Sequence, residues 1–437
     1  MEWYLTILII IGSLLVLMST GLPVAFAFMV VNIIGVYFLW GGGPGMEQLI
    51  DSFFSSITSF TFIPLPLFIL MGDFMFHSGI AVNMIDALDK WLGRLPGRLS
   101  LLAVASGTVL STLTGASIAS TAILGSTLVP EMEKRGYKKP MTLGPILGSG
   151  GLAIMIPPSS IAVFLAAIAV VSIGKLLVAA IIPGLLMAAL YAAYIITRCQ
   201  LQPSIAQAYD VAGVPISVKL LATVRYILPV GFIIFMVIGV ILIGIATPTE
   251  AAATGTVGVV ILIAIYRKLN WPVIKKAFSS AIGTTIMIFM IMVGAQAFSQ
   301  ILAFSGATRG LAQFAIALPV APLVIIIAMQ FVALILGMFM NVTPVIMICI
   351  PLFIPIVNTL GFDPLWFSAI FLINTEMAVT SPPFGLSLFV MKGVSPSGTR
   401  MGDIYRAALP FLGCDLVAVA LIIAFPAIAL WLPSVMG

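Results

Sequence analysis

Long apolar runs, separated by short polar segments, fill the chain from end to end. A helix needs about 20 mostly apolar residues to cross a bilayer. Runs of this length predict membrane-spanning helices near residues 4–20, 22–40, 55–76, 174–197, 227–246, 248–266, 278–298 and 407–434. Four other apolar segments, at 99–131, 141–172, 320–358 and 366–391, are interrupted by proline, glycine or short polar residues.

Composition indicates the class of protein. Apolar residues make up 62% of the 437 residues, charged residues only 8%, and the mean hydropathy is +1.25. Such a chain cannot bury its apolar surface in one water-soluble globule, so its solvent must be a lipid bilayer. The first apolar run lacks a basic leading segment and is followed directly by another, which predicts a retained span rather than a secretory signal. We therefore expect an all-α polytopic membrane protein.

The interrupted segments are of two kinds. Residues 99–131 and 320–358 are each long enough for two short helices joined at a small polar tip, "LSTLTGASIAST" and "LGMFMNVTPV", which predicts two re-entrant hairpins. Residues 141–172 and 366–391 contain the only two Pro-Pro dipeptides of the chain, in "LAIMIPPSSIAV" and "MAVTSPPFGLSL". Proline lacks a backbone donor and its ring clashes with the preceding turn, so each dipeptide predicts a broken helix.

The basic residues indicate sidedness. If neither hairpin crosses the membrane, all 19 Lys and Arg except Lys175 and Arg309 fall on one side. The positive-inside rule makes this side cytoplasmic and places both chain termini in the periplasm. Two full crossings in either hairpin would leave this assignment unchanged, so the hairpin prediction depends on the composition of the tips.

An internal repeat divides the chain into two halves. An offset of 225 residues relates Pro23 to Pro248, Pro130 to Pro355, Gly136 to Gly361, and the first Pro-Pro pair to the second. Gly136 and Gly361 are expected on opposite sides of the membrane, which predicts an inverted repeat. The expected domains are a first repeat at 1–198, a cytoplasmic connection at 199–225 and a second repeat at 226–437.

Two symmetric helix breaks are typical of a transporter whose binding site lies near the bilayer midplane. Carbonyl groups freed by the prolines need partners that lipid cannot offer, and sodium ions can bind them together with nearby hydroxyls. The hydroxyls beside the breaks belong to Ser159, Ser160, Thr380 and Ser381. Hydroxyls and helix N-termini, with no basic residue at membrane depth, suit a small organic anion, either a carboxylate or a sulfonate. For one break alone, a proline kink satisfied by neighbouring helices would be the better interpretation.

The first hairpin tip is rich in small residues that also pack helices together. Ser111, Gly115 and Ser117 favour a binding role, whereas Ser120 and Thr121 fit helix packing better. Both interpretations depend on how the tip turns at membrane depth.

Four acidic residues lie inside apolar runs: Asp73, Glu250, Glu376 and Asp415. An ionisable group at membrane depth is costly and is therefore a functional candidate. Glu250, in "TPTE", also fits a helix start with proline in its first turn. Glu376 lies one turn before the second break and is a candidate for orienting it, while Asp73 and Asp415 receive no role.

Other classes of function lack their usual sequence signals. One His and three scattered Cys without C-x-x-C spacing indicate no zinc or haem site. Neither a His cluster nor an acidic dyad indicates an intramembrane enzyme, and nothing repeats like the selectivity filter of a channel. The net charge of +5 follows membrane sidedness and does not indicate nucleic-acid binding.

An ordered set of motifs carries a family resemblance over essentially the whole chain. The motifs are "GLPVAFAF", "TGASIAS", "VPEMEKRGY", "GSGGLAIMIPPSS", "ATPTEAAATG", "GMFMNVTPVIMICIPLFIPI", "GFDPLWF" and "NTEMAVTSPPFG". They are similar to the large membrane subunit of tripartite ATP-independent periplasmic (TRAP) transporters. The resemblance implies an elevator-type, sodium-driven importer of organic acids in the bacterial inner membrane. It also implies two partners, a small four-helix membrane subunit and a periplasmic substrate-binding protein.

The resemblance also implies site residues. Its sodium sites carry over to Ser111, Gly115, Ser159, Gly337, Thr380, Ser381 and Pro383. Its substrate-contacting hydroxyls carry over to Ser117, Ser159 and Ser160. Relatives often have an acidic residue where this chain has Asn341, whose amide can still offer a carbonyl oxygen to sodium. A standalone elevator-type sodium and carboxylate symporter, working without a binding protein, is the alternative function.

Overall fold

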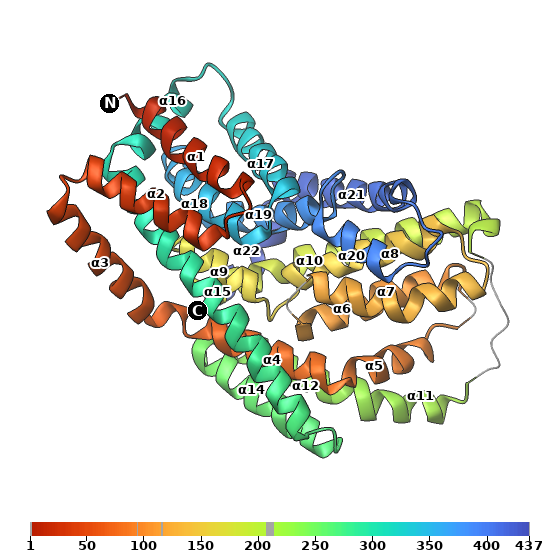
Figure 1. The fold of residues 1–437 in the computed structure, drawn as a ribbon. Helices are drawn as coiled ribbons and strands as arrows, with labels where there is room; N and C mark the ends of the chain where they lie inside the picture. The colour runs from red at the N-terminus through yellow and green to blue at the C-terminus, as the bar shows by residue number, and fades with distance from the viewer. Residues whose placement is uncertain (1, 94, 115–116, 207–213, 437) are drawn as a thin grey trace.

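A computed structural model describes residues 2–436 apart from 94, 115–116 and 207–213, and the side chains of 111–114 also lie outside the described part. The regular structure of the described residues is helical (Figure 1). Eight of the described helices are long and apolar enough to cross a membrane. The prediction of an all-α polytopic membrane protein is confirmed.

The helices of the first half are α1 (Trp3–Ser19), α2 (Val24–Leu39), α3 (Gly43–Thr58), α4 (Pro64–Ser78), α5 (Ile80–Asp89), α6 (Arg98–Thr114), α7 (Ser117–Lys134), α8 (Lys139–Met155), α9 (Ser160–Ile168) and α10 (Ile173–Leu201). Those of the second half are α11 (Ile216–Ala222), α12 (Leu228–Ile234), α13 (Val240–Leu242), α14 (Pro248–Ile265), α15 (Trp271–Phe304), α16 (Ala307–Ala317), α17 (Pro322–Phe339), α18 (Val342–Thr359), α19 (Pro364–Thr380), α20 (Leu386–Val394), α21 (Met401–Ala424) and α22 (Ala427–Ser434). Two π-helical stretches, η3 (Thr223–Ile227) and η4 (Phe235–Gly239), join α11, α12 and α13 into one continuous helix.

The second half repeats the helix order of the first. An offset of 225 residues converts the bounds of α7 into those of α18, and the bounds of α8 into those of α19. Contacts between the halves come in exchanged pairs, in which each helix of one contact is replaced by its counterpart from the other half. α4 packs on α14 while α15 packs on α2, and α9 packs on α18 while α20 packs on α7. Exchanged pairs are what a two-fold axis between the halves produces. How the halves are oriented relative to a bilayer stays a prediction.

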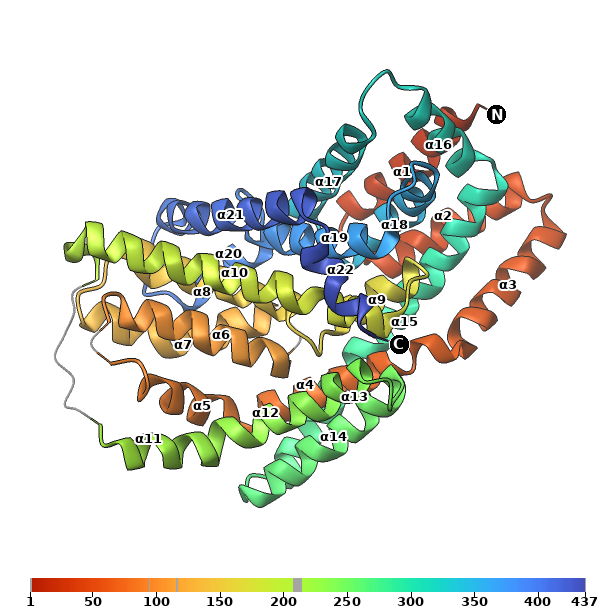
Figure 2. The ribbon, with the colours of Figure 1, turned by 180° about the vertical axis from the view of Figure 1, so that it is seen from behind.

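The helices form two groups, which Figures 1 and 2 show from opposite sides. In the first group α6, α7, α8 and α10 lie alongside α20 and α21. In the second, α4 packs against both the long α15 and α14, and α12 packs against α14. α15 has 34 residues. At 1.5 Å per residue it is about 51 Å long, well beyond the hydrocarbon thickness of a bilayer.

α8 and α19 are buried more completely than a membrane helix that faces lipid. Every residue of α8 from Met141 to Met155, and of α19 from Trp366 to Thr380, is buried. α8 packs against α6, α7 and α21, α19 packs against α17 and α18, and the two helices contact each other. Because neither lipid nor water reaches them, their polar side chains must find partners inside the protein.

The structure contains both predicted helix breaks and both predicted pairs of hairpin helices. α8 and α9 replace one helix at 141–172, α19 and α20 replace one at 366–391, and α6–α7 and α17–α18 form the two pairs. α17 and α18 each have the length and composition of a span. Whether these pairs re-enter or cross the membrane therefore stays a prediction.

Several predicted bounds are wrong. The predicted span at 55–76 starts too early, because residues 55–58 end the amphipathic helix α3, and the apolar span runs from a short 3₁₀ turn (Phe60–Phe62) to the end of α4 at Ser78. The predicted span at 407–434 is two helices, α21 and α22, which separate at Pro426. Within the predicted connection at 199–225, a helix already begins at Ile216, because "ISVKLLATVR" continues the apolar pattern of α12.

Candidate functional site

Both helix breaks lie at the Pro-Pro pairs. The first break separates α8 from α9, which are bent by 49° relative to each other, and the second separates α19 from α20. Both Pro-Pro peptide bonds are cis. Because neither proline of a pair has an N–H group, the carbonyls of Ala153 and Ile154 lose the donors that a continuous helix would give them. The breaks thus leave acceptors inside a fully buried region.

A cavity of about 170 Å³ lies where the breaks approach the two hairpins. Its lining comes from five segments: the start of α7, the first break, α15, the second hairpin tip and the end of α19. The lining residues are Ser117, Ile118, Ile154, Ser160, Ile161, Thr284, Met287, Ile288, Asn341, Val342, Thr343 and Val379. None of these side chains carries a formal charge. The cavity can therefore offer hydroxyl and amide groups to a small ligand, but no salt bridge.

The substrate-contacting serines of the sequence prediction lie at or beside this cavity. Ser117 and Ser160 line it. Ser159 is the N-cap of α9, is fully buried, and accepts a hydrogen bond from Ala162 N at 3.2 Å. The N-terminal end of α9, with its positive helix dipole, therefore lies directly beside the cavity lining.

Ser117 also joins the two halves. Its Oγ donates to Oε2 of Glu376 at 2.6 Å, and both side chains are buried. Glu376 packs against Gly151 of α8, where a methyl group would overlap the carboxyl group. The carboxyl group thus lies between the first hairpin and the helix that precedes the first break.

The predicted sodium ligands of the second half cluster at the end of α19. Thr380 Oγ1 donates to the carbonyls of Glu376 at 3.1 Å and Met377 at 3.2 Å, and Ser381 Oγ donates to Met377 O at 2.6 Å. A hydroxyl has one hydrogen and two lone pairs, so both oxygens keep acceptor capacity for a cation. Gly337 of α17 packs directly against Ala378 of α19, which brings the second hairpin close to this turn.

Two further predicted residues have observed partners. The carbonyl of Pro383 accepts a hydrogen bond from Tyr405 Oη at 2.9 Å and keeps a second lone pair. Asn341 is the N-cap of α18, where its Oδ1 accepts from Val342 N at 2.7 Å, and it also lines the cavity. Gly115 and the side chain of Ser111 lie outside the described residues.

The other acids of the apolar runs have distinct surroundings. Asp415 of α21 accepts a hydrogen bond from Tyr191 of α10, and Asp73 of α4 accepts one from Ser280 of α15 at 2.8 Å. Both pairs join helices of different halves. Glu250 forms a capping box with Thr247 at the start of α14, which confirms the sequence interpretation of "TPTE".

Sequence reasoning missed two threonines at the cavity and one glycine at the second break. Thr284 of α15 and Thr343 of α18 line it. Thr343 lies within the predicted tip "LGMFMNVTPV", so its position was a usable signal, whereas Thr284 lies mid-span with no local pattern to mark it. Gly385 was also missed: a methyl group there would lie 2.5 Å from the carbonyl oxygen of Val379 and 2.8 Å from that of Ser381. Its proximity to the second proline pair, in "SPPFG", is the only signal for it.

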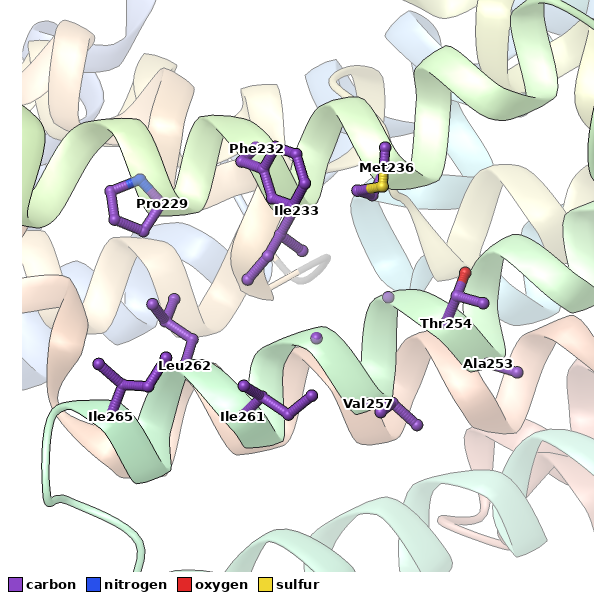
Figure 3. Close-up of a pocket in the computed structure, with 12 residues that line it drawn as sticks. Pro229, Phe232, Ile233, Met236, Ala253, Thr254, Val257, Ile261, Leu262 and Ile265 are labelled. Carbon is purple, nitrogen blue, oxygen red and sulfur yellow. The ribbon is translucent and has the colours of Figure 1, made fainter.

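The larger groove between α12 and α14 has a different character. It encloses about 590 Å³, and its lining is apolar except for Thr254 (Figure 3). An apolar groove of this kind has no groups that would orient a polar ligand. The smaller, polar cavity between the breaks is therefore the better candidate for a solute site.

Comparisons with known proteins place the chain beside membrane transporters. A family model described as "Tripartite ATP-independent periplasmic transporter, DctM component" matches residues 11–428. The chain is 31% identical over 396 residues to a C4-dicarboxylate TRAP transporter large permease protein of Pseudomonas aeruginosa, covering 90% of each chain. It is 28% identical over 424 residues to an isethionate TRAP transporter permease protein of Oleidesulfovibrio alaskensis, covering 97% of this chain and 66% of that one.

A solved structure shows a similar fold. The YdaH transporter of Alcanivorax borkumensis aligns with a TM-score of 0.63 at 14% identity, covering 87% of this chain and 88% of that one. At this identity the likeness concerns the fold alone.

Proposed function

Because the chain belongs to the DctM component family of tripartite ATP-independent periplasmic transporters, we propose that it is the large membrane subunit of a sodium-driven importer of a small organic acid anion. It is a multi-span transport protein of the bacterial inner membrane and not an enzyme. The observation that carries the proposal is the small polar cavity at which both hairpins and both helix breaks meet. Such meeting points are where secondary transporters bind solute and coupling ion.

The substrate proposal follows from the cavity lining. Ser160 and Thr284 offer hydroxyl groups, Ser117 lines the same cavity with a hydroxyl that already donates to Glu376, and the N-terminus of α9 lies nearby. These groups recognise an anion by hydrogen bonds and helix dipoles. The names of two relatives include a C4-dicarboxylate and isethionate, a carboxylate and a sulfonate. We therefore propose a small carboxylate or sulfonate as the substrate.

Sodium is proposed as the coupling ion. The end of α19 offers hydroxyl oxygens of Thr380 and Ser381 with free lone pairs, next to the second break. Hard cations prefer oxygen ligands of this kind, and the positive charge would offset burial of the anion. Ser111, Gly115, Ser159, Gly337, Asn341 and Pro383 complete the proposed sodium ligands.

The mechanism is proposed to be an elevator movement. The buried centre around α8 and α19 would move relative to the second group of helices, which contributes Thr284 to the cavity wall. A small four-helix membrane subunit and a periplasmic binding protein are the proposed partners. Both chain termini are proposed to face the periplasm.

We expect the matching binding protein to raise uptake at least about tenfold, because it delivers substrate at a high local concentration to the cavity. The measurement is uptake into proteoliposomes that contain this chain and its small subunit, with and without the binding protein, over a panel of carboxylates and sulfonates. Robust uptake without the binding protein would instead support the standalone symporter. An unrelated binding protein, loaded with its own ligand, is the control.

Ser159→Ala and Ser381→Ala should each raise the sodium concentration for half-maximal uptake about three- to tenfold, the effect of losing one hydroxyl ligand. Ser159 also caps α9, so Ser172→Ala, which removes the capping hydroxyl of α10, is the matched control. Sodium titrations of uptake, normalised to the amount of protein in the membrane, give the comparison. If both site variants keep the wild-type sodium dependence, the prolines only kink the helices and do not form a sodium site.

A further inference from the structure

Glu376 is a buried carboxyl group on α19, one turn before the second break. Its side chain is 1% exposed. Oε2 accepts the hydrogen bond from Ser117, while Oε1 has no hydrogen-bond partner. A buried carboxyl group with an unpaired oxygen is costly, and an ionisable group at membrane depth is a functional candidate.

Three segments of the proposed site meet at this residue. Ser117, the first residue of α7, bonds the carboxyl group and lines the cavity. Gly151 of α8 packs against the same carboxyl group one turn before the first break. Thr380, in the last turn of α19, bonds the Glu376 carbonyl at 3.1 Å. One residue therefore contacts the first hairpin, the helix before the first break and the turn beside the second break.

The repeat explains how Glu376 reaches this position. The offset of 225 residues relates Glu376 to Gly151, so the carboxyl group packs against its own repeat counterpart. Two equivalent positions can touch only near the two-fold axis between the halves. Because Gly151 has no side chain, the space beside the axis is open to the single carboxyl group of the second half.

We propose that Glu376 is a positioning residue that couples the substrate-facing hydroxyl of Ser117 to the sodium-binding turn at the end of α19. The short hydrogen bond fixes the start of α7 relative to α19, so a shift of either one moves the other. The inference rests on the proposed function, because it requires sodium at the second break. Because the bond needs both its donor and its acceptor, removing either one should weaken sodium binding.

The test measures sodium binding without any organic substrate. The chain and its small subunit are placed in nanodiscs, and their unfolding temperature is measured at increasing sodium concentrations, with choline keeping the ionic strength constant. The half-saturating sodium concentration is read from the shift in unfolding temperature. Glu376→Met keeps the volume but removes the acceptor, and Ser117→Ala removes the donor. We expect each to raise the half-saturating concentration about tenfold, and the double variant to raise it no further. Glu376→Gln keeps an acceptor and should stay within about threefold of the wild type.

Ser126→Ala, which removes an exposed hydroxyl from the same helix α7, is the control and should leave the titration unchanged. If Glu376 has only a structural role, the substitutions will lower the unfolding temperature measured in the absence of sodium and leave the half-saturating sodium concentration at its wild-type value. That result, or additive effects in the double variant, would overturn the inference. If Glu376→Met does not fold, Ser117→Ala breaks the same bond and decides the question. A wild-type protein that sodium fails to stabilise would instead overturn the proposed function.

Discussion

Replacing sodium with choline should lower uptake of the organic anion about hundredfold. An anion that enters a cavity without charged groups loses its hydration, and without sodium no positive charge offsets that free-energy cost. The cavity lining carries no formal charge, and the hydroxyls beside it are neutral. A bound sodium ion would supply that charge in the same region. The measurement is initial uptake into proteoliposomes with the binding protein present and only the external cation changed.

The control for ion replacement keeps the membrane potential equal in both arms, so that only the identity of the cation differs. Restoring sodium to the same vesicles should restore the rate. Equal uptake in potassium, driven by a proton gradient alone, would contradict sodium coupling. In that case the buried acids Glu376 and Asp415 would become the candidates for carrying the coupling ion.

Gly385→Ala should reduce sodium-driven uptake about hundredfold, the scale of effect when site groups are displaced by about 1 Å. The added methyl group would lie 2.5 Å and 2.8 Å from the carbonyl oxygens of Val379 and Ser381. Both oxygens belong to backbone, which cannot rotate away as a side chain can. Val379 lines the cavity and Ser381 is a proposed sodium ligand, so the second break would have to open at the site itself.

Gly393→Ala is the matched control, since it adds the same methyl group within α20, the helix that Gly385 precedes, with nothing within 4 Å. It should leave uptake unchanged. The amount of each variant in the membrane and its unfolding temperature show whether the protein still folds. A folded Gly385→Ala variant with wild-type uptake and wild-type sodium dependence would exclude the second break from the site.

Local chemistry made much of the fold predictable. Two adjacent prolines remove two successive N–H donors, so "IPPSS" and "SPPFG" marked both breaks without reference to any other part of the chain, whereas single prolines such as Pro145 and Pro183 stand inside continuous helices. Hydropathy located most of the long helices for a similar reason, because each span must be apolar by itself to lie in lipid. The capping of α14 by Thr247 and Glu250 is equally local.

The bounds that were wrong are those where the halves differ. The segment equivalent to α3 and α4 forms the single helix α15 in the second half. Hydropathy does not separate these outcomes, because both segments are apolar enough to be helical. What distinguishes them is proline, since α4 begins at Pro64 and Pro66, whereas the equivalent positions inside α15 are Phe289 and Ile291.

The candidate site depends on contacts between distant parts of the sequence. Ser117 and Glu376 are 259 residues apart, and neither shows in the sequence that it bonds the other. Thr284 contributes to the cavity only because α15 packs against α18 there. The polar residues at the tips and breaks were visible as candidates, but the groups that surround them were not.

The sequence by itself determined the membrane class, the two halves and the two helix breaks, because hydropathy, chain repetition and the missing proline N–H act along the chain. The tertiary structure alone decided which polar groups face one another. It placed the Glu376 carboxyl group against its repeat counterpart Gly151, and it brought both breaks and both hairpins to one cavity. The physical reason is that packing across a two-fold axis joins residues by their position in space, which no local pattern of residue types records.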